Sequence, residues 1–170
     1  MNLSLLHRIP EKWRARAMRA GFSVHPAFRR SGGRIQSISP DLSRVCIKLP
    51  FKWSTRNLVG SLYGGSLFAI TDGVHVAMLL ARLSRDFIVW DKAAAIRYRR
   101  PAYTTLFAEF RIDQKEIDDI CETIEKNGET SRKYTVELKD QYGEIYTVVE
   151  RMIYIADKAY YKQSKVSKGG

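Results

Sequence analysis

The longest apolar run of the chain lies in its middle, where the nonpolar residues of Leu67–Leu83 surround a helical axis instead of forming one stripe. A helix that is apolar on all sides is typically buried in a protein core. The pattern therefore predicts one long central helix over Leu62–Leu83, enclosed by the rest of the fold. Asp72 and His75 interrupt the run, so no apolar stretch reaches the roughly 18 residues that a membrane span needs.

Shorter segments on both sides of this helix alternate between apolar and polar residues, which is typical of strands with one buried face. Two of them, Arg34–Ser39 and Arg44–Leu49, precede the helix. Four follow it, and these are Ala94–Arg100, Tyr103–Ile112, Arg132–Asp140 and Ile145–Ile155. The order of two strands, one helix and four strands predicts an α+β domain, in which a twisted antiparallel sheet of five to six strands wraps around the helix.

The remaining segments divide the chain into three parts. Residues 1–32 form a basic lead-in, in which Glu11–Phe22 is predicted to be a short helix followed by irregular chain. Residues 33–157 form the domain itself, and residues 158–170 form a basic tail that we expect to be disordered. Within the domain, residues 113–129 are polar and acidic and end in a predicted tight turn.

Composition fits one ordinary globular domain, with 170 residues of which 45% are hydrophobic and 28% charged. The net charge of +11 comes from the ends, because residues 1–35 carry +7, residues 151–170 carry +4 and the middle is neutral. Such ends bind ligand phosphates, an anionic membrane or nucleic acid, or they are simply solvated. Cys46 and Cys121 fit neither a disulfide framework nor a zinc spacing, and each is expected to be a small buried residue. The N-terminus does not have the pattern of a secretory signal, so we expect a cytoplasmic protein.

Asp72 is the most informative residue, because an isolated carboxylate in a buried helix costs on the order of several kcal/mol unless it is paired, hydrogen-bonded or neutralised. The predicted helix also opens on Gly64 and Gly65, which let another group approach backbone amides that attract oxyanions. The pattern predicts an oxyanion-binding end and a general base on one element. Structural interpretations stay open beside it: Asp72 pairs with a basic strand residue or caps a loop, and the glycines serve helix–sheet packing.

The segment Asn57–Asp72, NLVGSLYGGSLFAITD, resembles the motif of hotdog-fold acyl-CoA thioesterases. It is most similar to the phenylacetyl-CoA thioesterase type, whose motif runs Asn, Gly, His-Gly-Gly and then Asp. A bacterial branch with Tyr-Gly-Gly-Ser in place of His-Gly-Gly resembles most of the chain, from His25–Phe28 through Val89–Lys92 to Tyr154–Lys158. The resemblance implies a hotdog fold.

The resemblance also implies hydrolysis of an acyl-CoA or acyl-carrier-protein thioester, with no metal or redox cofactor and with coenzyme A only as part of the substrate. By the motif, the Gly64 amide would polarise the thioester carbonyl, Asp72 would activate water or attack the thioester, and Asn57 would help hold the water. Hotdog sites form between two protomers. A homodimer or a pair of dimers is therefore implied, with Gly64 and Asp72 of one site supplied by different chains.

The expected substrate-binding residues are Gly65, Tyr63, Phe68, Trp90, Tyr98, Arg97, Arg99 and Arg100. The arginines offer forked donors for the phosphates of coenzyme A, or they form a solvated strand face that pairs with the acidic residues 113–129. The aromatic residues Phe68, Trp90 and Tyr98 line an acyl pocket or belong to the core.

Tyr63 departs from the motif, because a tyrosine hydroxyl titrates near pH 10 and cannot relay protons near neutrality as histidine does. His75, one turn beyond Asp72, either compensates or is a packed helix residue. Two other functions therefore stay open: a catalytically silent hotdog protein that binds acyl-CoA or fatty acyl ligands, and a binder of nucleic acid or anionic surfaces through the basic ends. Neither specific nucleic-acid binding nor a transmembrane segment is expected.

Overall fold

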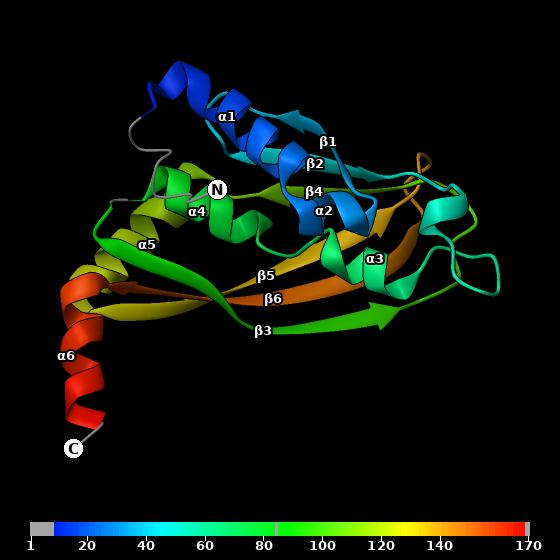
Figure 1. Cartoon of the computed structure of the whole chain (residues 1–170). Coiled ribbons are helices and arrows are strands. Elements are labelled where there is room, and N and C mark those ends of the chain that lie inside the picture. The colour runs from blue at the N-terminus through cyan, green and yellow to red at the C-terminus, as the bar shows by residue number, and fades with distance from the viewer. Residues whose placement is uncertain (1–8, 84, 169–170) are drawn as a thin grey trace.

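A single antiparallel sheet dominates the computed structural model, which describes residues 9–83 and 85–168 (Figure 1). Its strand order is β1-β2-β4-β5-β6-β3, and all neighbouring strands are antiparallel. The strands are β1 (Arg34–Ile38), β2 (Arg44–Leu49), β3 (Phe87–Tyr98), β4 (Leu106–Arg111), β5 (Glu129–Lys139) and β6 (Ile145–Asp157). The predicted α+β class and all six predicted strands are confirmed. The first eight residues of the predicted lead-in and the last two of the tail lie outside the described residues.

The central helix lies on the concave face of this sheet and has two segments, α3 (Gly64–Ala69) and α4 (Val74–Arg82). A turn at residues 70–73 separates them, and it ends at Gly73, whose φ of 68° is a left-handed conformation that glycine adopts without steric cost. The predicted central helix is confirmed, but the turn moves Asp72 out of the helical core. The prediction that Asp72 is buried was wrong, because its side chain is 65% exposed.

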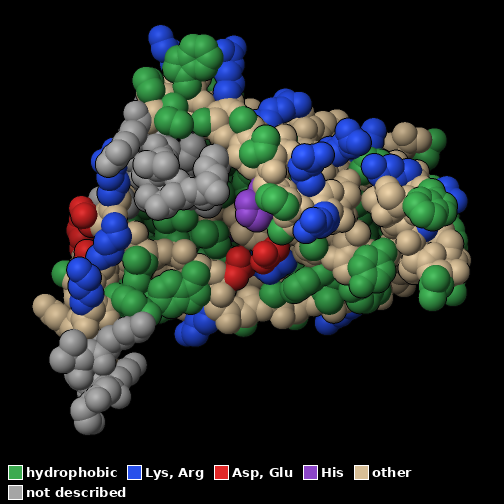
Figure 2. All heavy atoms as spheres, viewed as in Figure 1, with side chains coloured by type: hydrophobic (Ala, Val, Ile, Leu, Met, Phe, Trp, Pro, Cys, Tyr) green, Lys and Arg blue, Asp and Glu red, His purple; other side chains and the backbone are tan. Residues whose placement is uncertain are grey.

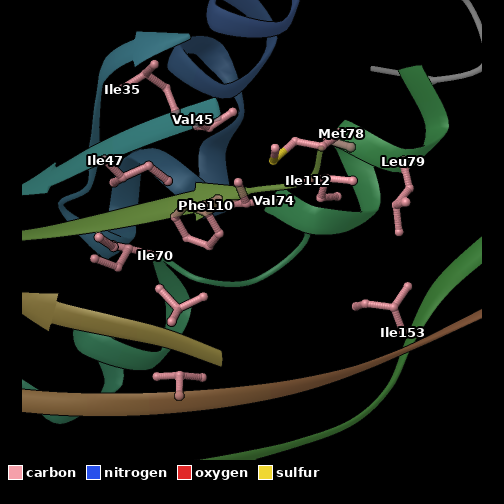
Figure 3. Close-up of a cluster of buried hydrophobic side chains, with 14 of the residues drawn as sticks. Ile35, Val45, Ile47, Ile70, Val74, Met78, Leu79, Phe110, Ile112 and Ile153 are labelled. Carbon is pink, nitrogen blue, oxygen red and sulfur yellow. The ribbon is translucent and has the colours of Figure 1, made fainter. Parts of the chain in front are cut away.

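Apolar side chains from the central helix and the sheet meet between the two layers (Figure 3). Ile70, Val74, Met78 and Leu79 of the helix are fully buried, and they face strand residues that are also buried, among them Val45, Ile47, Phe110 and Ile153. Helix Gly64–Arg82, taken as one unit, is long and apolar enough to cross a membrane, yet 56% of its apolar window is buried inside the fold. Core packing therefore accounts for its composition.

Two N-terminal helices, α1 (Glu11–Val24) and α2 (Pro26–Ser31), cover one part of this arrangement. The predicted helix of the lead-in is confirmed as α1, and α2 forms where irregular chain was expected. Met18 of α1 is fully buried in the core, whereas Trp13 is 46% exposed. The N-terminal helices are therefore packed parts of the domain.

Two further helices occupy segments in which the sequence indicated none, and a short 3-10 helix, η2 (Trp53–Thr55), precedes the central helix. Residues 113–129 contain α5 (Gln114–Asn127), which begins at the N-cap Asp113 and buries Ile117, Ile120 and Ile124. The expected disordered tail contains α6 (Lys158–Lys168). The tight turn predicted after the acidic segment is the C-cap of α5 at Gly128, with φ of 77°.

Candidate active site

Asp72 is held in the turn of the central helix by Arg151 of β6. Arg151 Nη1 donates to Asp72 Oδ1 at 2.9 Å, and the arginine side chain is only 3% exposed. The two partners differ sharply in burial, because the carboxylate of Asp72 remains mostly in solvent. The sequence left open that Asp72 pairs with a basic strand residue, and this contact is present.

The Arg151 guanidinium also donates hydrogen bonds at the C-terminal end of α3. Its Nη2 donates to the carbonyl oxygen of Phe68 at 3.1 Å and to Thr71 Oγ1 at 2.9 Å, and its Cζ lies 4.3 Å from the centre of the Phe68 ring. A cation at a helix C-terminus is stabilised by the free carbonyls and the helix dipole. Arg151 therefore fixes the end of α3, and with it the position of Asp72.

A second carboxylate, Asp91 of β3, lies near the same arginine, with its Oδ1 3.7 Å from Arg151 Nη1. Its side chain is 23% exposed, and burial raises its pKa, against the opposing effect of the positive charge of Arg151. The register of β3 against β6 shifts between Asp91 and Ala93, which is a β-bulge. Bulges commonly re-aim side chains near functional sites. The sequence indicated neither Arg151 nor Asp91 as a site residue.

Gly64 and Gly65 begin α3, and each lies directly beneath a tyrosine ring. The Tyr98 hydroxyl donates to the Gly64 carbonyl oxygen at 3.1 Å, and a Cβ on Gly64 would come within 3.0 Å of that hydroxyl. A Cβ on Gly65 would come within 2.3 Å of the Tyr63 ring. In this arrangement the two tyrosine side chains occupy the space that a side chain at either glycine would take, and the amides of this first helical turn have no acceptor within the helix.

Asn57 organises the loop before the central helix. Its side-chain oxygen accepts from the backbone amides of Val59 and Ser61, both at 3.1 Å, and its Nδ2 donates to Ser61 Oγ at 2.9 Å. Within one chain, these three hydrogen bonds make Asn57 a residue that stabilises the loop. Its predicted contact with a catalytic water stays a prediction.

The three aromatic residues expected to line one acyl pocket have different surroundings. Trp90 packs on Tyr154 and Tyr161, with ring centres 4.4 and 5.3 Å apart. Tyr98 contacts Gly64, and Phe68 packs against Arg151. That they line an acyl pocket stays a prediction.

The arginine cluster at the end of β3 is exposed to solvent. Arg97, Arg99 and Arg100 are all exposed, and Arg100 pairs with Glu144 at 2.8 Å in the β5–β6 turn. The acidic segment pairs instead with Arg132, whose Nε lies 4.0 Å from Glu116.

His75 is a packed core residue. It is 3% exposed, stacks on Tyr134 at 4.4 Å and meets Phe110 edge-on at 5.1 Å. Burial, with a smaller contribution from the positive charge of Arg151, lowers the His75 pKa to about 4. This surrounding matches the interpretation of His75 as a packed helix residue. The cysteines are free and half-buried, and among the described residues no three His, Cys, Asp or Glu side chains are placed to hold a metal.

A cavity of about 260 Å³ opens beside Asp72. Its lining residues come from α1, α2 and the end of α3, and they are Gly21, Phe22, His25, Ala27, Phe28, Ala69, Asp72 and Gly73. Figure 2 draws one face of the molecule, and near its middle it shows acidic side chains and a histidine, with Lys and Arg side chains around them. The sequence indicated Asp72 alone among these residues as a site residue.

Residues 14–155 match the family described as a domain of unknown function, DUF4442. The chain belongs to the DUF4442 family. The match begins inside α1 and ends in β6, so this DUF4442 domain includes most of α1 and all of α2. No curated protein matches the sequence.

Solved structures similar to this DUF4442 protein share its fold at low sequence identity. PA5026 of Pseudomonas aeruginosa, described as a protein of unknown function and probable thioesterase, is 23% identical with a TM-score of 0.75, over 84% of this chain and 95% of the other. The thioesterase HI1161 of Haemophilus influenzae is 11% identical with a TM-score of 0.62, over 85% and 91%. The PaaI protein of the E. coli phenylacetic acid degradation operon is 18% identical with a TM-score of 0.56, over 84% and 91%. These likenesses confirm the hotdog fold.

Proposed function

We propose that this protein is a thioesterase that hydrolyses an acyl-CoA or acyl-carrier-protein thioester. One observation carries the proposal: the carboxylate at the acidic position of the motif is fixed by a buried arginine, exposed to solvent and placed beside a cavity. A structural ion pair alone does not require an open cavity at the carboxylate. The names of the similar structures add support at the level of the reaction class.

Asp72 is the general base in this proposal. Arg151 binds its Oδ1, so Oδ2 is available to take a proton from a water molecule. The water oxygen then bonds to the thioester carbonyl carbon and the carbon–sulfur bond breaks. The sulfur leaves as a thiolate that takes up a proton, and the products are a free acid and a thiol.

The site is completed by a second copy of the chain. Gly64 begins α3, and Asp72 lies in the turn beyond the C-terminal end of this helix, so the length of α3, roughly 7.5 Å at 1.5 Å per residue, stands between them. A site in which one thioester carbonyl contacts both groups is therefore assigned to Gly64 of one chain and Asp72 of another. The edge strand β3, paired on one side with β6 and exposed at Ala93–Ala95, offers a surface for a homodimer. The Gly64 amide of the second protomer would then stabilise the oxyanion.

The polar part of the substrate is assigned to the basic end of β3. Arg97, Arg99 and Arg100 are exposed and close in sequence to Tyr98, which contacts Gly64. Forked guanidinium groups match the phosphates of coenzyme A. Tyr63 and Gly65 would contact the substrate near the oxyanion site, and the two free cysteines fit a reducing, cytoplasmic setting.

A catalytically silent acyl-binding protein is the second candidate, because the Arg151 contact gives Asp72 a structural partner and Tyr63 replaces the motif histidine. A screen of acetyl-, octanoyl-, phenylacetyl- and palmitoyl-CoA, measuring released thiol, separates the two. We expect turnover of at least one of them. If all four bind but none releases thiol, the silent protein is the correct description.

A further inference from the structure

The cavity beside Asp72 has two walls from different parts of the chain. One wall is the turn that ends α3, with Ala69, Asp72 and Gly73. The opposite wall is the corner between α1 and α2, with Phe22 and Phe28 as its large side chains. The carboxylate therefore lies at the edge of an otherwise largely apolar chamber.

The aromatic wall is a packed arrangement. The rings of Phe22 and Phe28 meet edge-on with centres 5.1 Å apart. Phe28 is 7% exposed and lies against Gly33, where a Cβ would come within 3.1 Å of the Phe28 ring and 2.8 Å of Ile70. The wall thus packs beside Gly33, which precedes β1, and near Ile70 at the end of α3.

Small residues keep the facing wall open. Ala69 has only a methyl group, and a Cβ added to Gly73 would meet no atom within 4 Å. Larger side chains at these positions would project into or across the space beside the carboxylate. The sequence thus provides room next to Asp72 and places aromatic rings across from it.

We propose that this cavity binds the apolar acyl group of the thioester and that Phe22 and Phe28 set its permitted size. The inference rests on the proposed function, because Asp72 links the cavity to the reacting carbonyl. Its volume of about 260 Å³ lies just below the range of roughly 300–1,000 Å³ that is usual for small-molecule sites. The chamber therefore fits a medium-length or aryl acyl group, while the charged coenzyme and a long fatty acyl chain exceed it.

The test changes the size of the cavity from both walls. Ala27→Leu, at an exposed lining position of α2, fills it, and Phe22→Ala enlarges it. Val24→Ala is the matched control, because Val24 ends α1, is 67% exposed and does not line the cavity. kcat/KM is measured for acetyl-, octanoyl-, phenylacetyl- and palmitoyl-CoA.

Ala27→Leu should lower kcat/KM for octanoyl- and phenylacetyl-CoA by about 10-fold or more relative to acetyl-CoA, since one methylene in a pocket typically discriminates by that factor. Phe22→Ala should raise the palmitoyl-to-octanoyl ratio, and Val24→Ala should leave every ratio unchanged. Octanoate binding, followed by NMR in the Asp72→Asn protein, gives a readout independent of turnover. We expect Ala27→Leu to weaken it.

The outcomes separate this inference from the proposed function. Turnover that depends on Asp72 but keeps its acyl profile in both cavity variants overturns the acyl site and leaves the thioesterase standing. Octanoate binding that Ala27→Leu abolishes, in a protein without turnover, supports the acyl site and overturns the thioesterase. Octanoate binding that neither cavity variant changes counts against the acyl site.

Discussion

At the residue scale, Arg151 explains how a charged group is accommodated in the core of this fold. Its guanidinium is buried, yet its bonds to Asp72, Thr71 and the Phe68 carbonyl satisfy it. Because Asp72 is mostly exposed, the cost of desolvation falls on the arginine and on the half-buried Asp91. The pair therefore supports the turn of the central helix as well as the orientation of the carboxylate.

Replacing Arg151 by methionine should lower the free energy of unfolding by about 3 kcal/mol or more, the usual cost of breaking a buried charged network. Asp91 would lose its countercharge, and the Phe68 carbonyl would lose its donor. Urea unfolding measures the change. Arg97→Met, at an exposed position of β3, is the control and should change stability by less than about 0.5 kcal/mol. Equal stability of the two variants would refute the structural role of Arg151.

Acid sensitivity is a second prediction at this scale. The folded-state pKa of His75 is lowered to about 4, whereas an unperturbed histidine titrates near 6.5. Between these values the unfolded chain binds a proton that the folded protein excludes. The contribution of His75 to the free energy of unfolding is therefore fully present above about pH 6.5. It falls by roughly 3 kcal/mol at most as the pH drops towards 4.

His75→Phe keeps an aromatic ring between Tyr134 and Phe110 and should remove this part of the acid sensitivity. Urea unfolding near pH 7 and near pH 4.5 measures the loss of stability between the two pH values. The control variant His25→Gln, at an exposed position, should retain this loss. An unchanged pH dependence in His75→Phe would show that the acid response arises elsewhere.

At the element scale, the sequence predicted the strands and the central helix well, because alternation and an all-round apolar run are strong local signals. It missed the turn at residues 70–73, since an apolar run does not reveal a break that a distant arginine stabilises. It also missed α5, although Ile117, Ile120 and Ile124 recur at helical spacing after Asp113, a good N-cap. Phe22, Phe28 and Arg151 could not be identified as site residues, because only tertiary packing brings them to Asp72.

The N-terminal helix is expected to be part of the cooperative unit. Met18→Ala should destabilise the protein by about 2–5 kcal/mol, because the side chain is fully buried and its loss leaves a cavity. Trp13→Ala, on the same helix but 46% exposed, should cost clearly less. Urea unfolding curves compare the two. A Met18→Ala protein as stable as the parent would show that α1 does not contribute to the stability of the domain.

At the scale of the whole molecule, the distance between Gly64 and Asp72 makes the proposed site a property of the homodimer. Gly64→Val and Asp72→Asn proteins should each be inactive alone, the first because a side chain there meets the Tyr98 hydroxyl. After unfolding and joint refolding, half of the dimers are mixed, and each has one site with both groups intact. Activity should then return to about a quarter of the parent value, as two-fold symmetry requires. A site formed within one chain would give no recovery.

The carboxylate of Asp72 is proposed to perform the chemistry, and a comparison with Asp91 distinguishes this role from a structural one. Both aspartates lie near Arg151, but only Asp72 lines the cavity. Asp72→Asn should reduce kcat on the preferred acyl-CoA by about 100-fold or more, the range that loss of a general base costs. Asparagine keeps an oxygen that accepts from Arg151, and Asp91 still lies 3.7 Å from that arginine, so Asp72→Asn should lower the free energy of unfolding much less than Arg151→Met does.

Asp91→Asn removes a negative charge beside Arg151 but leaves Asp72, the proposed general base, in place. Its turnover should therefore stay within about tenfold of the parent. The measurement is kcat by thiol release for the parent and both variants, on folded protein of matched concentration. We expect a large loss of kcat in Asp72→Asn alone. Full turnover in Asp72→Asn, or equal losses in the two variants, would contradict it.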